Sequence, residues 1–233
     1  MSNDDLQGLY PFLYSDESRL AAVDAVIEHV RRSTVEKAHE IIRLRSLVME
    51  RDGDRLAAAA EAMAQRFAAG GRLLAFGNGG SSTDAQDLVS LFLSPAPDAP
   101  SLPAMCLTND IAVITALCND VGFEVVFSRQ LAAFGRAGDI AVGLSTSGNS
   151  TNLLWAFNEA TRCGMLTIGI CGYDGGKMAE LESIDYLFVV PSSSVHRIQE
   201  AQTTIYHVLW ELTLGALENV SEDVSVDPES DQP

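Results

Sequence analysis

The sequence predicts an α/β protein in which helices cover both faces of a doubly wound parallel sheet. Two observations lead to this prediction. From residue 72 onward, short apolar runs alternate with helical patterns, and two of these runs are followed directly by loops rich in glycine or serine. Short, continuous apolar strands that alternate with helices are typical of parallel sheets buried on both faces, and right-handed crossovers make such a sheet doubly wound.

The N-terminal part is predicted to be helical. Residues 1–16 are an extension without periodicity. In residues 17–49 apolar side chains recur at three- and four-residue spacing, which predicts an amphipathic helix. The polar segment 51–54 is expected to break it, before an alanine-rich helix runs to about Ala69 and ends at the glycine pair 70–71. This much helix outside the sheet predicts a homo-oligomer contact, or else packing within the monomer.

The sheet and its helices follow in alternation. The apolar runs predict five strands: Arg72–Phe76, Ala104–Leu107, Ile140–Leu144, Leu166–Cys171 and Tyr186–Val190. Helical patterns lie near 82–94, 110–134, 151–163, 176–182 and 195–218. Residues 220–233 hold five acidic side chains and no basic ones, which predicts a disordered acidic tail.

The composition excludes some functions. With 233 residues, 47% of them hydrophobic, the chain can bury a sizeable core. Its net charge is −17, and its densest basic cluster, within residues 31–45, is interleaved with glutamates, so direct nucleic-acid binding is not expected. No apolar stretch reaches the roughly 18 residues that span a membrane. Four cysteines without a CxxC pair, behind a polar N-terminus, favour reduced thiols and the cytoplasm.

Two loops are expected to bind an anion, because ligands of open parallel sheets sit beyond the carboxyl ends of the strands. The loop Gly77–Ser81 follows the first strand and opens a helix, whose free N–H groups favour negative charge, although it could be only a structural turn. The loop Ser145–Ser150 has four hydroxyls in six residues. Hydroxyl and N–H groups together satisfy phosphate oxygens, whereas Ser150 alone could serve as an N-cap.

Further polar residues lie where a ligand would be reached. Asn119 and Asp120 follow an apolar stretch, and Asp120 could cap the next helix or contact a sugar hydroxyl. Gln199 and His207 are eight residues apart, so they share one face of the final helix. His207 alone could equally be a core or surface residue.

Taken together and in order, these motifs resemble the phosphoheptose isomerases of the SIS superfamily over residues 17–219. The motifs are GNGGS (77–81), ND (119–120), STSGNS (145–150), GYDGGKM (172–178), RIQE (197–200) and a histidine eight residues beyond the Gln. The resemblance implies a single SIS domain with a five-stranded parallel sheet and with N-terminal helices in the core of a homo-oligomer, a tetramer or dimer. It also implies conversion of sedoheptulose 7-phosphate to a heptose 7-phosphate through an enediol. It implies a sugar site at Asn78, Gly79, Gly80, Ser81, Asn119 and Asp120, a phosphate site at Ser145, Thr146, Ser147 and Ser150, and substrate or zinc ligation by Gln199 and His207.

The chain departs from the family in the helix after GNGGS. There the isomerases carry a His and, four residues later, a Glu that is the catalytic base and a zinc ligand; the matching positions hold Asp87 and Leu91. Leucine binds neither a proton nor a metal, so no cofactor is expected and zinc is doubtful. Asp87 lies one helical turn before Leu91 and could replace the base together with His207.

Two hypotheses about function follow. The first is an aldose–ketose isomerase of a phosphorylated sugar, with Asp87 and His207 as catalytic residues. The second is a non-catalytic protein that responds to a sugar phosphate or binds a protein partner, like the replication-initiation regulators that resemble these isomerases.

Overall fold

The computed structural model describes residues 16–94 and 99–225, so the predicted N-terminal extension and most of the acidic tail lie outside the described residues. The chain divides into two compact units, residues 1–43 and 44–233. The second unit contains the sheet and all of the loops discussed above. The domain boundaries expected at 16/17 and 219/220 stay predictions.

Helix α2 (Asp16–Ala68) is continuous, so the predicted break at 51–54 is wrong. A glycine inside a helix costs about 1 kcal/mol, which is less than the 1.5–3 kcal/mol that full burial of one leucine contributes. Arg51 donates to the buried carboxylate of Asp52 at 3.1 Å and to the carbonyl of Val189 at 2.6 Å. One turn later Leu56 is completely buried. Tertiary contacts therefore keep this polar segment helical.

The predicted glycine cap of α2 is confirmed. Gly70 has a φ of 83°, in the left-handed region. Its N–H donates to the carbonyl of Phe67 at 2.9 Å, and the N–H of Gly71 donates to the carbonyl of Arg66 at 2.8 Å. This pair of bonds is the Schellman arrangement, which satisfies the last carbonyls of the helix.

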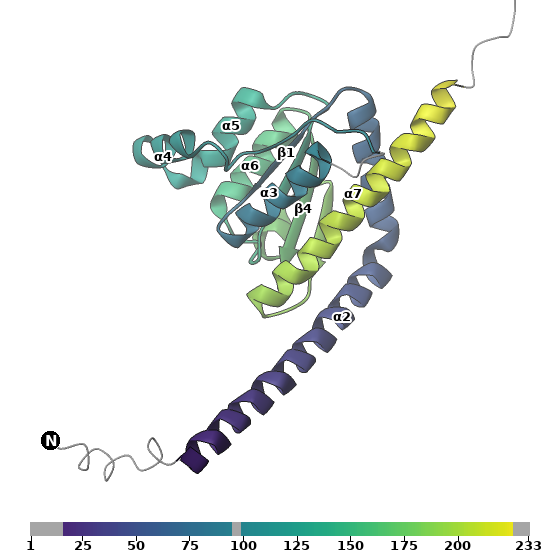
Figure 1. Cartoon of the computed structure of the whole chain (residues 1–233). Coiled ribbons are helices and arrows are strands. Elements are labelled where there is room, and N and C mark those ends of the chain that lie inside the picture. Colours follow the sequence, from purple (N-terminus) through teal and green to yellow (C-terminus); the bar gives the residue numbers. More distant parts are fainter. Residues whose placement is uncertain (1–15, 95–98, 226–233) are drawn as a thin grey trace, which may run out of the picture. The chain divides into compact units, whose positions relative to one another are not determined.

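The five predicted strands form one parallel sheet, as expected (Figure 1). Its order is β2-β1-β3-β4-β5, and each neighbouring pair is parallel. The strands are β1 (Leu73–Gly77), β2 (Ala104–Cys106), β3 (Ile140–Leu144), β4 (Leu166–Gly172) and β5 (Tyr186–Val190). Every residue of β1, β3 and β4 is buried, which is why these strands are apolar without alternation.

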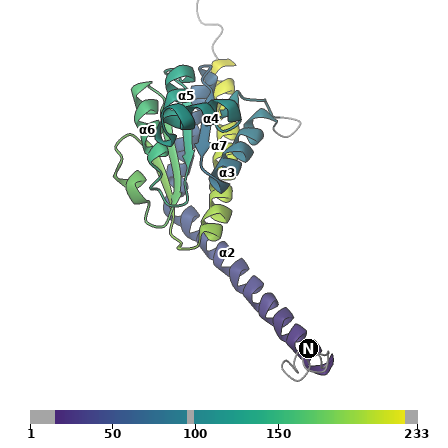
Figure 2. The same ribbon diagram turned by 90° about the vertical axis from the view of Figure 1, so that its left-hand side faces the viewer.

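Helices cover both faces of the sheet (Figure 2). Helices α5 (Val126–Phe134) and α6 (Thr151–Arg162) lie on one face, and α3 (Gly80–Leu93) and α7 (Val195–Ser225) lie on the other. The α5–α6 side buries a cluster centred on Phe76, whose ring centroid lies 5.5 Å from that of Phe127 and 5.4 Å from that of Phe157. On the other side Phe67 of α2 packs against Phe92 of α3 at 5.3 Å.

The segment 110–134, expected to be helical, forms three separate helical elements. Helix α4 (Ile111–Asp120) is capped by Asp110, whose carboxylate accepts from the N–H groups of Ala112 and Val113. After Gly122, which has a φ of 150°, the short 3-10 helix η2 (Phe123–Val125) leads into α5. Among the described residues α4 buries none of its side chains, although most of them are apolar.

The remaining expectations concern the C-terminal helix, the cysteines and the membrane. Helix α7 continues to Ser225, past the expected end at 218. All four cysteines are unpaired thiols, with Cys106 and Cys171 buried. Over the described ranges, no helix combines the length and apolar character needed to cross a membrane.

Candidate functional site

The loops after β1 and β3 meet at the carboxyl edge of the sheet. In the order β2-β1-β3-β4-β5, the chain adds β2 on one side of β1 and then β3 on the other side. Ligands of open parallel sheets bind at such a switch point, which here lies between β1 and β3. The side chains of Asn78 and Asn152 join the turn after β1 to the first turn of α6, because each amide donates to the carbonyl oxygen of the other at 2.9 Å. The topology thus brings together the two anion-receptive loops that the sequence predicted.

Two hydroxyl groups of the Ser145–Ser150 loop accept hydrogen bonds from the loop's own backbone. The Oγ of Ser145 accepts from the N–H of Gly148 at 3.1 Å, and the Oγ of Ser147 accepts from the N–H of Asn149 at 3.2 Å. A hydroxyl that accepts from the backbone still has its own O–H to donate. These serines can therefore donate to an anion while they hold the loop.

Ser150 occupies the N-cap position of α6, but within the described residues its side chain makes no capping hydrogen bond. The alternative that Ser150 serves only as a cap is thus not borne out. Its hydroxyl and the free N–H groups of the first turn of α6 remain for an anion. Thr146 lies in the same loop and is partly exposed.

The turn after β1 packs directly against α7. A Cβ atom on Gly80 would lie 2.1 Å from the Nε2 of Gln199, so a larger residue here would displace that amide from its present position. Gly79 has a φ of 55°, which also favours glycine. Ser81, the second residue of α3, is 4% exposed. Gln199 is thereby held beside the start of α3, as the predicted site requires.

Asp87 and His207 face each other across α3 and α7. The Nε2 of His207 lies 3.7 Å from the Oδ2 of Asp87. The buried Tyr206 donates its hydroxyl to the same oxygen at 2.7 Å, and its ring stacks on that of His207 with centroids 5.3 Å apart. Burial raises the pKa of Tyr206, which keeps its hydroxyl protonated and able to donate. Asp87 is thus fixed toward the imidazole.

A second carboxyl, Asp84, lies one turn before Asp87 on α3. Burial raises its pKa from 3.8 to about 6, a hydrogen bond from Gln199 opposes this rise, and the charge of Asp87 adds to it. Within the described part of the chain, the buried Oδ2 of Asp84 has no hydrogen-bond partner. The two carboxyls therefore differ in environment: Asp84 is partly buried, and the Asp87 side chain is 53% exposed.

Asn119 and Asp120 lie at the end of α4, and their predicted contact with the sugar stays a prediction. Both are exposed at the end of α4, where the amide of Asn119 donates to the carboxylate of Asp120 at 2.7 Å. Asp120 does not cap the next helix, because the N-cap residues of η2 and α5 are Gly122 and Val125. Neither residue lines the cavity of about 320 Å³ formed by Asn78, Phe123, Glu124, Ser150, Thr151 and Asn152.

The donor set does not fit the zinc site that the resemblance implies. Leu91, one turn after Asp87 on α3, has no donor atom, and Gln199 is engaged with Asp84. The described residues contain no group of three or more His, Cys, Asp or Glu side chains arranged to hold a metal ion. A protein zinc site ordinarily takes three or four protein ligands. We therefore derive no chemical step through a metal.

The sequence analysis does not identify Tyr206 and Asp84 as site residues. An aromatic residue in a helical pattern is ordinarily part of the core, and the one local signal for Tyr206 is its position next to His207. Asp84 lies three residues before Asp87, a spacing that puts two carboxyls near each other on a helix.

Known proteins resemble the chain along most of its length. The SIS domain matches residues 38–172. A phosphoheptose isomerase of Desulfovibrio desulfuricans is 43% identical over 194 residues, covering 83% of this chain and 88% of that protein. One of Nitratidesulfovibrio vulgaris is 40% identical, covering 80% and 89%. The solved phosphoheptose isomerase of Neisseria gonorrhoeae has a TM-score of 0.73 at 36% identity, covering 79% of this chain and 98% of that one.

Proposed function

The chain belongs to the SIS domain family and, within it, to the phosphoheptose isomerase type, and from this premise we propose that it isomerises a sugar phosphate. The reaction is the aldose–ketose interconversion of sedoheptulose 7-phosphate through an enediol. The relatives described above carry the name of this activity. The observation that carries the proposal for this chain is the Asp87–His207 pair, 3.7 Å apart beside the anion-receptive loops.

The phosphate is bound by the loop after β3. The O–H groups of Ser145, Thr146, Ser147 and Ser150 donate to its oxygens, together with the N–H groups at the start of α6. The sugar then extends past Asn78, Gly79 and Gly80 toward Gln199. Gly80 supports this path because its missing Cβ lets Gln199 approach the turn.

Proton transfer is assigned to Asp87 and His207. Asp87 removes the proton from the carbon next to the carbonyl, while the imidazolium of His207 donates a proton to the carbonyl oxygen, which gives the enediol. The neutral imidazole then takes the proton from the neighbouring hydroxyl as Asp87 returns its proton to the former carbonyl carbon. A general acid or base of this kind contributes about 10²–10⁴-fold to the rate. Tyr206 holds the Asp87 carboxylate in place through its 2.7 Å hydrogen bond.

The alternative, a non-catalytic regulator, is less well supported. It draws on Leu91, which replaces the family's catalytic Glu, but Asp87 places a carboxylate one turn away on the same helix. The relatives reported above are named isomerases and not regulators. A catalytic role for the site therefore agrees better with both observations.

The test is deuterium exchange. Sedoheptulose 7-phosphate is incubated with the protein in D₂O, without metal and then with zinc, and followed by NMR. We expect deuterium next to the carbonyl without added metal, and its loss in His207→Ala and Asp87→Asn. Unchanged exchange in Asp87→Asn would refute the role of that carboxylate, and saturable binding without any exchange would support the regulator.

The proposal includes the oligomeric state of the protein and its cellular compartment. Exposed apolar side chains of the first unit (Val23, Val26, Ile27, Val30) support a homo-oligomer, to be measured by light scattering. The four unpaired cysteines support a reducing compartment, which we take to be the cytoplasm.

A further inference from the structure

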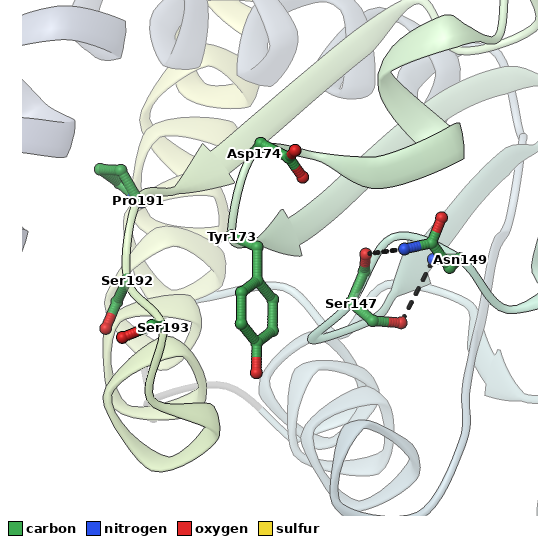
Figure 3. A pocket seen from close by; sticks show the side chains of 7 residues that line it. All are labelled: Ser147, Asn149, Tyr173, Asp174, Pro191, Ser192 and Ser193. Carbon is green, nitrogen blue, oxygen red and sulfur yellow. Dashed lines mark hydrogen bonds between the residues drawn. The ribbon is translucent and has the colours of Figure 1, made fainter.

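The motif GYDGGKM has no part in the proposed reaction, yet it forms one wall of a cavity. The cavity has a volume of about 670 Å³ (Figure 3). It lies between the loops that follow β3, β4 and β5, and none of its lining residues belongs to α3 or α7, which carry the Asp87–His207 pair. The described lining residues are Ser147, Asn149, Tyr173, Asp174, Pro191, Ser192 and Ser193.

The loops after β3 and β4 are packed backbone against backbone. A Cβ atom on Gly148 would lie 2.0 Å from the carbonyl oxygen of Gly175, and one on Gly176 would lie 2.5 Å from that of Ser147. The Asn149 amide donates to the carbonyl of Ser147 at 2.9 Å and accepts from the N–H of Lys177 at 3.0 Å. This side of the cavity is therefore preorganised, and it shares Ser147 with the phosphate loop.

Tyr173 supplies an aromatic surface at some cost in backbone energy. It is the one non-glycine residue of the described chain with a positive φ, 55°. A residue held in this region costs on the order of 1–3 kcal/mol and persists where the surroundings require it. Its ring projects between the Ser147 loop and the Ser192–Ser193 loop (Figure 3). The residue as a whole is 39% exposed. An open aromatic face beside hydroxyls suits the apolar face of a sugar ring.

The polar groups of the cavity favour a neutral polyol over a second phosphate. Asp174 accepts from the N–H of Gly176 with Oδ1, which leaves Oδ2 for ligand hydroxyls. Ser192 and Ser193 add hydroxyls that donate and accept. The described lining contains one carboxylate and no lysine or arginine, so an anion would be repelled there.

We propose that this cavity is a second carbohydrate site, which binds a neutral sugar between the Tyr173 ring and the carboxylate of Asp174. The site does not depend on the isomerase reaction, since it shares no residue with the proton-transfer pair. Because Ser147 borders both, a sugar in this site lies next to the phosphate in the loop after β3.

The experiment is saturation-transfer NMR with unphosphorylated sedoheptulose, recorded on the full chain in the presence of saturating inorganic phosphate. Tyr173→Asn removes the ring while keeping a residue that tolerates positive φ, and Tyr173→Phe keeps the ring. We expect about ten-fold weaker binding for Tyr173→Asn and for Asp174→Asn, and near wild-type binding for Tyr173→Phe. Phe123→Ala, an exposed aromatic residue of the smaller cavity, is the matched control and should bind as wild type.

Three results would overturn the proposal. The first is the absence of sedoheptulose binding to the wild type. The second is equal binding by Tyr173→Asn and the wild type. The third is weakening by Asp87→Asn but not by Tyr173→Asn, which would place the neutral sugar in the isomerase site. Deuterium exchange on sedoheptulose 7-phosphate, measured on the same variants, reports the isomerase reaction separately.

Discussion

Restoring the missing glutamate should rescue the enzyme when Asp87 is disabled. Asp87→Asn removes the proposed base, so we expect exchange to fall about 10²–10⁴-fold, equivalent to about 3–5 kcal/mol of barrier. Leu91→Glu, made in the Asp87→Asn background, returns a carboxylate one helical turn away on the same face of α3. We expect most of the lost exchange to return.

The structure allows the substitution at a modest cost in stability. Leu91 is only partly buried, so a fraction of the 1.5–3 kcal/mol of a fully buried leucine is lost. Glutamate and leucine have similar helix propensities. With Asp87 replaced by asparagine, no like-charge pair forms at that spacing. The free energy of unfolding should fall by about 1–2 kcal/mol, as measured in urea.

Leu91→Gln in the same background is the matched control, because it has nearly the same shape as glutamate but cannot take a proton. The assay is deuterium incorporation into sedoheptulose 7-phosphate at saturating concentration, with binding measured in parallel. If the Glu variant folds and binds but exchanges no faster than the Gln variant, the position is not within reach of the reacting carbon and the reasoning is refuted.

Three further predictions concern stability. Gly53→Ala should raise the free energy of unfolding by about 1 kcal/mol in a urea titration, because nothing lies within 4 Å of the added Cβ in this helical segment. Gly148→Ala should lower the free energy of unfolding by about 2–4 kcal/mol, seen as a lower melting temperature, and should abolish binding of inorganic phosphate, because the added Cβ would lie 2.0 Å from the Gly175 carbonyl. Burial raises the pKa of Asp84 to about 6, so the folded protein keeps a proton that the unfolded chain releases above pH 3.8, and stability falls as the pH rises through that window. Asp84→Asn should flatten this fall by about 1 kcal/mol, since the half-exposed carboxyl is screened by water, and urea titrations at both ends of the window would check it.

The sheet could be predicted from the sequence because burial on both faces makes its strands apolar without interruption. Each of the five strand predictions lies within one residue of the observed bounds at either end. The error at 51–54 has a different cause. Local polarity suggested a turn, but Arg51 donates to the carbonyl of Val189, a partner that lies far away in the sequence and that no local pattern reveals.

The candidate site also has one part that local sequence predicts and other parts that depend on residues far apart in the sequence. The Ser145–Ser150 loop was predictable because its hydroxyls are adjacent in the sequence. The hydrogen bond from Tyr206 to Asp87 joins two helices that lie far apart in the sequence, with β2 to β5 between them, so no local pattern predicts it. The cavity at Tyr173 combines three loops, and its aromatic wall depends on a positive φ that composition does not reveal.

The contact between Gly148 and Gly175 has a consequence for protein engineering. The Ser145–Ser150 loop and the loop after β4 contact each other through the backbone at Gly148 and Gly175, so a library that randomises either glycine would mostly yield misfolded variants. Diversity is better placed at Tyr173, Ser192 and Ser193, whose side chains line the cavity. A selection for altered sugar preference would then vary the side chains that face the cavity and leave the Ser145–Ser150 loop unchanged.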